Sequence, residues 1–194
     1  MLGGNPVALQ VPIGDEMDFK GVVDLISKEA IVWNEEDKGM YYETIEIPAE
    51  LIDVVNEKRG ELIEAVAEYD ETLMEKFFED EDSITEYEII AALRAATIDM
   101  SIIPMMCGSA FKNKGVQAML DAVMRYLPSP MDVEAIEGTN PDTGNPDFRK
   151  PTVSEPFSAL AFKIATDPFV GRLCFFRVYS GALDAGSYVK NTRS

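Results

Sequence analysis

Short apolar runs separated by turn residues fill the first 47 positions, and this pattern predicts β-strands. Residues 41–47 alternate polar and apolar side chains, which is typical of an antiparallel strand with one buried face. Three further runs read as strands, at residues 7–14, 19–26 and 29–33. Acidic, serine and glycine positions between the runs supply the turns. We therefore predict four strands in this region.

From Pro48 onward the spacing of apolar residues changes to that of helices. One face of a helix over residues 49–69 collects the apolar positions Ile52, Val55, Leu62, Ile63, Val66 and Tyr69. The opposite face collects four glutamates that we expect to be exposed and without lysine partners: Glu57, Glu61, Glu64 and Glu68. A second helix is expected over residues 71–78. A third runs to about residue 98, capped by Ser83 or Thr85, because residues 85–88 resemble a capping box.

The remaining sequence predicts a strand, a helix and then a second region made of strands. An apolar strand over residues 102–107 leads into a turn of small residues, and a helix over 115–126 ends before two prolines. Residues 131–155 are rich in Pro, Gly, Asn and Asp and read as a linker. Strands at 157–164, 173–180 and 187–190 follow. Three strands do not close a barrel, so we expect residues 156–194 to be the truncated start of an all-β barrel.

These elements give an α+β fold class. Residues 1–100 form a mixed sheet-and-helix subdomain with four strands and about three helices, and residues 101–130 add one strand and one helix. The linker and the start of the barrel complete the chain.

The charge of the chain changes what the helical region can bind. The net charge is −18, and residues 43–88 alone carry 17 acidic and three basic side chains. Such a block repels phosphate, so it is not a surface for DNA or RNA. It is either a solvated surface or a docking face for a basic protein.

Cysteine and histidine usage narrows the chemistry further. Cys107 and Cys174 lie in apolar runs and are expected to be buried free thiols, which fits a reducing cytoplasm. The chain has no histidine, the commonest general base and metal ligand. No apolar run approaches the length of a membrane span. We therefore expect a cytoplasmic protein with no membrane contact and no metal site.

Motifs of nucleotide hydrolysis are missing from the sequence. There is no G-x-x-x-x-G-K-[ST] phosphate loop, and Asn113-Lys114 lacks the aspartate of N-K-x-D. Residues 18–21 fit D-x-x-G, but they lie in a strand pattern and are interpreted as structural. A hydrolase that uses paired carboxylates is the weakest alternative, because no acidic pair accompanies a nucleophile.

Residues 108–117, followed by Leu-Pro-Ser-Pro at 127–130, resemble the last guanine-contacting motif of translational GTPases, most closely the elongation factor G family. The resemblance implies that the backbone around Ser109 and Ala110 contacts the guanine carbonyl oxygen and that Phe111 flanks the base. In the intact protein the nucleotide would be GTP or GDP with Mg²⁺. This chain alone is not expected to hold a nucleotide tightly, since one or two backbone hydrogen bonds contribute only about 1 kcal/mol each.

Two further stretches carry the same resemblance. Residues 5–100 match an insert of the GTPase domain that contacts the C-terminal domain of the ribosomal stalk protein, and we assign that contact to Glu57, Glu61, Glu64 and Glu68. Residues 167–173 and 176–181 match the first hairpin of the second, barrel domain, which touches ribosomal RNA. Arg172 and Arg177 are the weaker candidates for that RNA contact. On this basis residues 101–130 are the C-terminal strand and helix of a P-loop GTPase domain.

The expected parent therefore uses GTP hydrolysis to drive movement of messenger and transfer RNA through the ribosome. Its hydrolysis residues would precede Met1, so the chain is a non-catalytic piece that docks on the ribosome and links two domains. A peptide release factor GTPase and a ribosomal protection protein share this layout and remain alternatives. An acidic interaction module unrelated to GTP is the alternative from another class.

Overall fold

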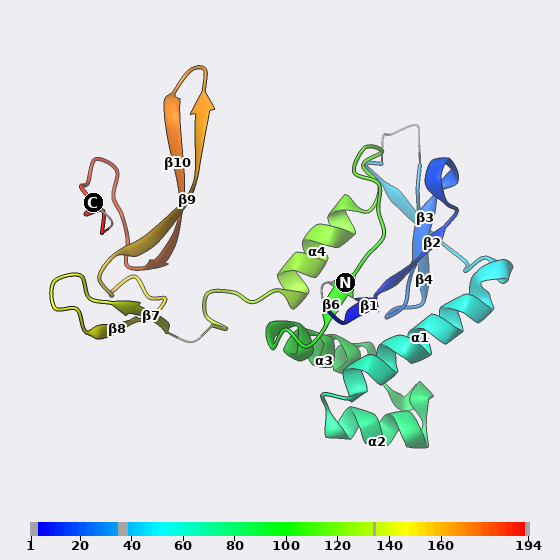
Figure 1. The fold of residues 1–194 in the computed structure, drawn as a ribbon. Helices are drawn as coiled ribbons and strands as arrows, with labels where there is room; N and C mark the ends of the chain where they lie inside the picture. Colours follow the sequence, from blue (N-terminus) through cyan, green and yellow to red (C-terminus); the bar gives the residue numbers. More distant parts are fainter. Residues whose placement is uncertain (1–3, 35–38, 134, 193–194) are drawn as a thin grey trace. The chain divides into compact units, whose positions relative to one another are not determined.

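The computed structural model describes residues 4–34, 39–133 and 135–192, and it divides into two compact units, residues 1–127 and 128–194 (Figure 1). The first unit contains the predicted region 1–100 together with residues 101–127 of the predicted region 101–130. Helices and several sheets are both present, and the α+β class is confirmed. Among the described residues, no helix is both long and apolar enough to cross a bilayer.

Two sheets share the first unit. Four antiparallel strands lie in the order β2 (Gln10–Ile13), β3 (Gly21–Asp24), β4 (Glu29–Trp33) and β5 (Tyr42–Ile45). A second sheet pairs β1 (Pro6–Ala8) in parallel with β6 (Ile103–Met105). The single strand predicted over residues 7–14 is thus split between the two sheets. Leu9 is the division point, because its amide donates to Met105 O at 2.9 Å while its carbonyl accepts from Leu25 N at 3.0 Å.

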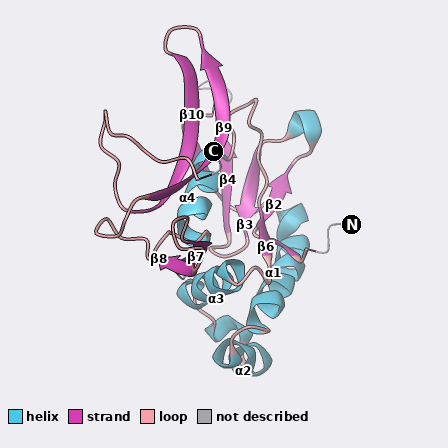
Figure 2. Cartoon of the chain, turned by 60° about the vertical axis from the view of Figure 1, so that its left-hand side comes forward, coloured by secondary structure: helices cyan, strands magenta, loops and turns pink. Residues whose placement is uncertain are grey.

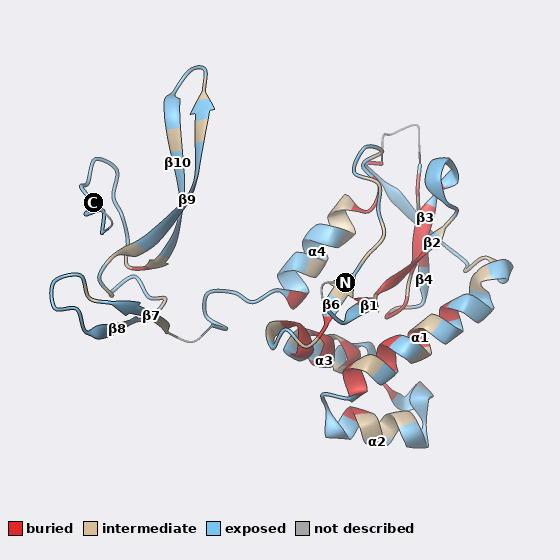
Figure 3. Cartoon of the chain, viewed as in Figure 1, coloured by how far each residue is buried: buried red, intermediate tan, exposed pale blue. Residues whose placement is uncertain are grey.

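The helices pack around these sheets. The short turn η2 (Ala49–Leu51) precedes α1 (Ile52–Ala67), and α2 (Glu71–Glu79), η3 (Glu81–Ser83), α3 (Glu86–Ile98) and α4 (Val116–Tyr126) follow. Figure 3 shows buried positions concentrated in β3, α1 and α3. The fully buried side chains include Leu25, Leu62, Ile63, Ile89 and Leu93.

The predicted apolar face of α1 is correct in its middle and wrong at its ends. Val55, Leu62, Ile63 and Val66 are buried, but Ile52 and Tyr69 are 45% and 43% exposed. Ile52 begins the helix and Tyr69 lies beyond it, where neighbouring elements no longer cover them. Arg59 takes a core-facing position instead, with 9% exposure. Its Nη1 donates to the carbonyls of Leu25 and Ile26, which join α1 to the end of β3.

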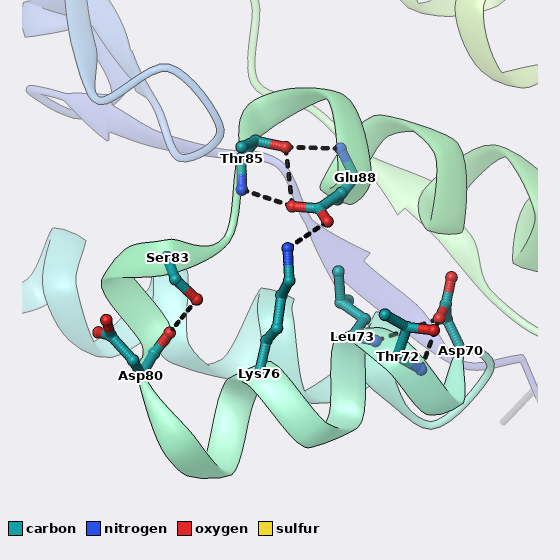
Figure 4. Close-up of polar contacts among 8 residues, drawn as sticks. All are labelled: Asp70, Thr72, Leu73, Lys76, Asp80, Ser83, Thr85 and Glu88. Carbon is teal, nitrogen blue, oxygen red and sulfur yellow. Dashed lines mark hydrogen bonds and ion pairs between the residues drawn. The ribbon is translucent and has the colours of Figure 1, made fainter.

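Polar caps fix the path of the chain from α2 to α3 (Figure 4). Asp70 Oδ1 accepts from the amides of Thr72 and Leu73 at the start of α2. At the start of α3, Glu88 Oε2 accepts from Thr85 N at 2.9 Å, and the Thr85 hydroxyl accepts from Glu88 N at 3.4 Å. This is the predicted capping box, with Thr85 rather than Ser83 as the cap.

A lysine connects the two capped helices. The ammonium of Lys76 on α2 pairs with Glu88 Oε1 on α3. This hydrogen bond, together with those from Thr85, lowers the pKa of the Glu88 carboxyl to about 2. Ser83 donates instead to Asp80 O at 2.7 Å, at the end of α2.

The second unit consists of two antiparallel hairpins. The first joins β7 (Ile136–Thr139) to β8 (Pro146–Arg149), and the second joins β9 (Ser158–Asp167) to β10 (Gly171–Ser180) (Figure 2). The prediction of a linker over residues 131–155 is therefore wrong for the first hairpin. Its turn residues caused the error, since Asn140 Oδ1 accepts from Asp142 N and Thr143 N inside the hairpin loop.

The third strand predicted at residues 187–190 is also not observed. Ser187 N donates to Asp184 O at 3.1 Å, which closes a turn, and residues 187–190 form no strand. Tyr188 and Val189 have high strand propensity, but no neighbouring strand pairs with this segment among the described residues.

Candidate functional site

A small closed loop follows β6 and precedes α4. Ser109 and Lys114 exchange both backbone hydrogen bonds, at 2.9 and 3.0 Å, and Asn113 N donates to Ala110 O at 3.2 Å. Asn113 and Gly115 have φ values of +56° and +84°, a region that glycine and asparagine adopt most easily. The loop therefore has a defined shape that its own backbone maintains.

Two lysine side chains attach this loop to the segment before β3. Lys114 is 2% exposed, and its Nζ donates to Phe19 O at 3.0 Å. Lys112 Nζ donates to Met17 O at 2.7 Å. Each of these contacts joins residues 95 positions apart in the sequence, which explains why sequence periodicity alone gave no sign of them.

Gly115 allows α4 to begin close to the strand that precedes the loop. A Cβ at this position would lie 3.0 Å from Cys107 O and 3.2 Å from the Gly108 Cα. The Cys107 amide in turn donates to Gln10 Oε1 at 3.2 Å on β2. The loop is consequently held by β2, by the segment before β3 and by the first turn of α4.

The exposed side of the loop offers a backbone donor at Ala110 beside the aromatic ring of Phe111. The Ser109 amide is occupied by Lys114, whereas no described residue accepts a hydrogen bond from the Ala110 amide. Ala110 is exposed, and the Phe111 side chain is fully exposed. A backbone N–H next to a free aromatic face suits the polar edge of a planar base. The three residues predicted for base contact thus lie together, and Ala110 offers an amide beside the exposed Phe111 ring.

The two thiols differ in environment. Cys107 is half-buried, and burial raises the pKa of its thiol. Cys174 is exposed on β10, so the prediction that it is buried is wrong. An apolar run marks burial only where a second layer covers the strand, and much of β9 and β10 is exposed. Within the described ranges, no group of three Asp, Glu or Cys side chains is placed to hold a metal ion.

The four predicted glutamates share the exposed side of α1. Glu57, Glu61, Glu64 and Glu68 are all exposed. The expectation that none has a lysine partner is wrong for Glu61, because Lys58 Nζ lies 2.7 Å from its carboxylate. That hydrogen bond raises the pKa of Lys58. Their spacing of three residues places the pair on one side of the helix, where such pairs form.

Arg172 and Arg177 lie on β10 and are exposed. They are separated by five positions, so they point to opposite faces of the hairpin. Arg177 stacks over the Tyr179 ring at 5.4 Å. At the tip of the hairpin, Asp167 Oδ1 accepts from Phe169 N and Val170 N at 2.8 Å, and these bonds lower the pKa of Asp167.

Comparison with known proteins matches the whole chain to one family. The chain is 64% identical over 194 residues to elongation factor G of Cytophaga hutchinsonii, 62% over 193 residues to that of Amoebophilus asiaticus, and 54% over 193 residues to that of Karelsulcia muelleri. The chain belongs to the elongation factor G family. It spans only 27–28% of the length of these elongation factor G relatives, each of which covers all of it. No family model matches the chain.

A solved structure resembles the fold as well. A crystal structure of a protein from Thermus thermophilus superposes with a TM-score of 0.68 at 25% identity, covering 94% of this chain and 24% of that protein. The match to a segment of elongation factor G confirms the family that residues 108–117 indicated. Sequence reasoning missed the buried Arg59 and the two lysines that hold the turn, Lys112 and Lys114. All three contact residues that are far away in the sequence.

Proposed function

We propose that this chain is part of an elongation factor G that uses GTP hydrolysis to promote movement of tRNA and mRNA through the ribosome. In this role the chain catalyses nothing itself. It supplies a guanine-contacting turn, a docking surface and a connection to the second domain. The observation that carries the proposal is 64% identity to an elongation factor G along the entire chain, together with the available Ala110 amide in the loop after β6.

The guanine contact rests on the geometry of one donor. Guanine presents a carbonyl oxygen where adenine presents an amino group, so a fixed N–H favours guanine and opposes adenine. The Ala110 amide is held in place by the Ser109–Lys114 bridge and by the two lysine anchors. Phe111 provides an exposed ring for the face of the base. GTP or GDP with Mg²⁺ is the corresponding ligand of the intact protein.

An exchange chimera tests this contact in a complete protein. The matching segment of the Cytophaga hutchinsonii elongation factor G is replaced by this chain, and GDP binding is measured for the parent chimera, Ala110→Pro and Ala110→Ser. Proline removes the N–H, and Ser109 before it is already in a β-bridge. Serine keeps the N–H and serves as the matched control.

The expected loss is about 1–2 kcal/mol for Ala110→Pro, or roughly five- to thirtyfold in GDP affinity, and little for Ala110→Ser. The diphosphate of 2-aminopurine riboside lacks the carbonyl oxygen, so its affinity should not change in Ala110→Pro. Equal losses for both nucleotides would show that the substitution damages the loop rather than a base contact. An unchanged GDP affinity would refute the assignment.

The acidic side of α1 is the proposed docking surface for the ribosomal stalk protein. Of its four exposed glutamates, Glu61 is the one with a lysine within ion-pair distance among the described residues, and residues 43–88 carry a large excess of acid. Like charges three or four residues apart destabilise a helix slightly, and a basic partner would relieve this repulsion. The C-terminal domain of the stalk protein is the partner that the family resemblance names.

Charge reversal tests the docking surface. Replacement of Glu57, Glu61, Glu64 and Glu68 by lysine should abolish salt-sensitive binding to the purified stalk domain in an NMR titration. The control reverses four exposed acids elsewhere in the same unit, Asp15, Glu16, Glu43 and Glu46. Equal weakening in both variants would point to net charge alone, and undiminished binding after the first would contradict the assignment.

Contact with ribosomal RNA is the least supported part of the proposal. Arg172 and Arg177 point to opposite faces of the hairpin, so one RNA strand lying on one face would meet only one of them. Arg177 is already stacked on Tyr179, which leaves Arg172 as the better candidate. A release factor GTPase or a protection protein would use the same turn, but the matched relatives favour elongation factor G. A cytoplasmic role without a DNA partner is part of the same proposal.

A further inference from the structure

The loop after β6 contacts one end of the β2–β5 sheet. Because the four strands form an antiparallel meander, the β2–β3 and β4–β5 connections lie at the same end of the sheet. The loop of residues 109–114 lies at this end (Figure 1). Its lysine anchors reach the first connection, at Met17 and Phe19. The second connection contacts the loop as well, at Gly39.

Gly39 lies directly against the backbone of the loop. A Cβ at this position would be 2.7 Å from Asn113 O and 2.9 Å from Lys112 O. Ordinary van der Waals contact begins at 3.4 Å, so a side chain here would push the two backbones apart by about 0.7 Å. Gly39 also has a φ of +72°, which glycine adopts without strain. The close approach of the β4–β5 connection to the loop therefore depends on glycine.

The first turn of α4 joins the same connection. Gln117 Nε2 donates to Met40 O at 3.3 Å and to Gly39 O at 3.5 Å. The ammonium of the buried Lys114 donates to Phe19 O, on the β2–β3 connection. The loop is thus fixed by both connections of the sheet, by one through ammonium groups and by the other through close backbone packing.

A displacement at Asn113 reaches the amide that the loop offers to a base. Asn113 N donates to Ala110 O at 3.2 Å, and Ser109 and Lys114 exchange both of their backbone hydrogen bonds. These bonds join residues 109–114 into one closed unit, so a push on Asn113 or the loss of the Lys114 anchor also moves Ala110. A shift of about 0.7 Å exceeds the tolerance of about 0.5 Å within which a binding group must be held.

We propose that this end of the β2–β5 sheet sets the guanine selectivity of the nucleotide site, with Gly39 and Lys114 as positioning residues. Neither residue touches the base, and each acts through the position of the Ala110 amide. The inference rests on the proposed contact between that amide and the guanine carbonyl oxygen. It adds that the sheet, which is distant from the loop in sequence, is needed for recognition of the base and not for folding alone.

The exchange chimera carries the test, with GDP and the diphosphate of 2-aminopurine riboside as ligands. Gly39→Ala and Lys114→Met should each weaken GDP binding about three- to tenfold and change binding of the second nucleotide less than about twofold. Phosphate contacts are common to both nucleotides, so a misplaced base contact alone produces this difference. Lys112→Met removes the less buried anchor and should give a smaller loss with the same selectivity.

Gly144→Ala is the matched control for the glycine substitution. Gly144 has a φ of +71°, and no described atom lies within 4 Å of a Cβ built there. The variant therefore carries the same backbone strain without the contact, and it should bind both nucleotides as the unmodified chimera does. Urea unfolding of each variant reports whether it is folded, and the half-buried Lys112 keeps the anchor testable if Lys114→Met does not fold.

A double variant shows whether the effect passes through Ala110. Once Ala110→Pro has removed the N–H, Gly39→Ala should cause no further loss of GDP affinity, and a full additional loss would overturn the proposal. Equal losses for both nucleotides in Gly39→Ala and Lys112→Met would mean that the sheet only supports the folding of the loop. If Ala110→Pro weakens GDP selectively but none of the three sheet-contact variants does, the guanine contact stands and this inference is wrong. If Ala110→Pro leaves GDP affinity unchanged, the guanine contact itself fails.

Discussion

Replacement of Arg59 by methionine should destabilise the first unit far more than its place on a charged helix suggests. Arg59 is 9% exposed, and its Nη1 donates to the carbonyls of Leu25 and Ile26, the latter at 2.7 Å. Methionine keeps an unbranched apolar stem in the same space but removes the donor. Two carbonyls at the end of β3 would then lose a charged partner.

The magnitude follows from these two bonds. Hydrogen bonds to a charged group contribute about 1.5–3 kcal/mol each, and part of this is offset because the variant no longer buries a guanidinium. We expect a net loss of about 2–4 kcal/mol in the free energy of unfolding, with a fall in Tm of roughly 10 °C for a unit of this size. Arg59→Lys should recover only part of it, since a lysine ammonium does not reproduce the guanidinium geometry.

The assay is urea unfolding followed by Trp33 fluorescence, which reports on the first unit because the chain has one tryptophan. Lys58→Met is the matched control on the neighbouring residue. Lys58 pairs with Glu61 at the surface, so its loss should change stability far less than the loss of Arg59. Equal effects of the two substitutions, or a loss below about 1 kcal/mol for Arg59→Met, would refute the role given to the buried guanidinium.

Three further predictions concern the capped helix and the loop after β6. Thr85→Ala should cost about 1 kcal/mol in urea unfolding, because it removes the N-cap of α3. The folded chain lowers the pKa of the Glu88 carboxyl from 4.5 to about 2, so this carboxyl binds a proton more readily in the unfolded chain. Its contribution to the free energy of unfolding is therefore fully present above pH 4.5 and is lost as the pH falls toward 2. The urea midpoint of the unmodified chain should therefore fall more steeply over that range than that of Glu88→Gln. Gly115→Ala should cost about 1–2 kcal/mol in the same assay, because φ is +84° and the new Cβ would approach Cys107 O.

Helix caps and helix ends were predicted correctly from the sequence. The capping box of residues 85–88 and the end of α3 at Ile98 match the prediction, and α2 begins at the predicted residue. Each depends on contacts within one helical turn, which the spacing of residues encodes directly. The turn of small residues before α4 was located for the same reason, and the family resemblance supplied the role proposed for it.

Contacts between distant segments were not predictable in the same way. The division of the first strand at Leu9 depends on Met105 and Leu25, and the burial of Lys114 depends on Phe19 O. Asn and Gly in the β7–β8 turn have the same composition as a linker, so only pairing across the turn distinguishes the two. For the candidate site, periodicity could place Ser109, Ala110 and Phe111 in a turn, but it could not show that the Ser109 amide is occupied and the Ala110 amide is not.

The most direct measurement for the account is ribosome-stimulated GTP hydrolysis by the exchange chimera that contains this chain. If the chain is the corresponding part of an elongation factor G, ribosomes should stimulate hydrolysis by the chimera about as strongly as by the unmodified Cytophaga hutchinsonii protein. Ala110→Pro in the chimera should raise the GTP concentration needed for half-maximal hydrolysis. A folded chimera that ribosomes do not stimulate at saturating GTP would contradict the central claim.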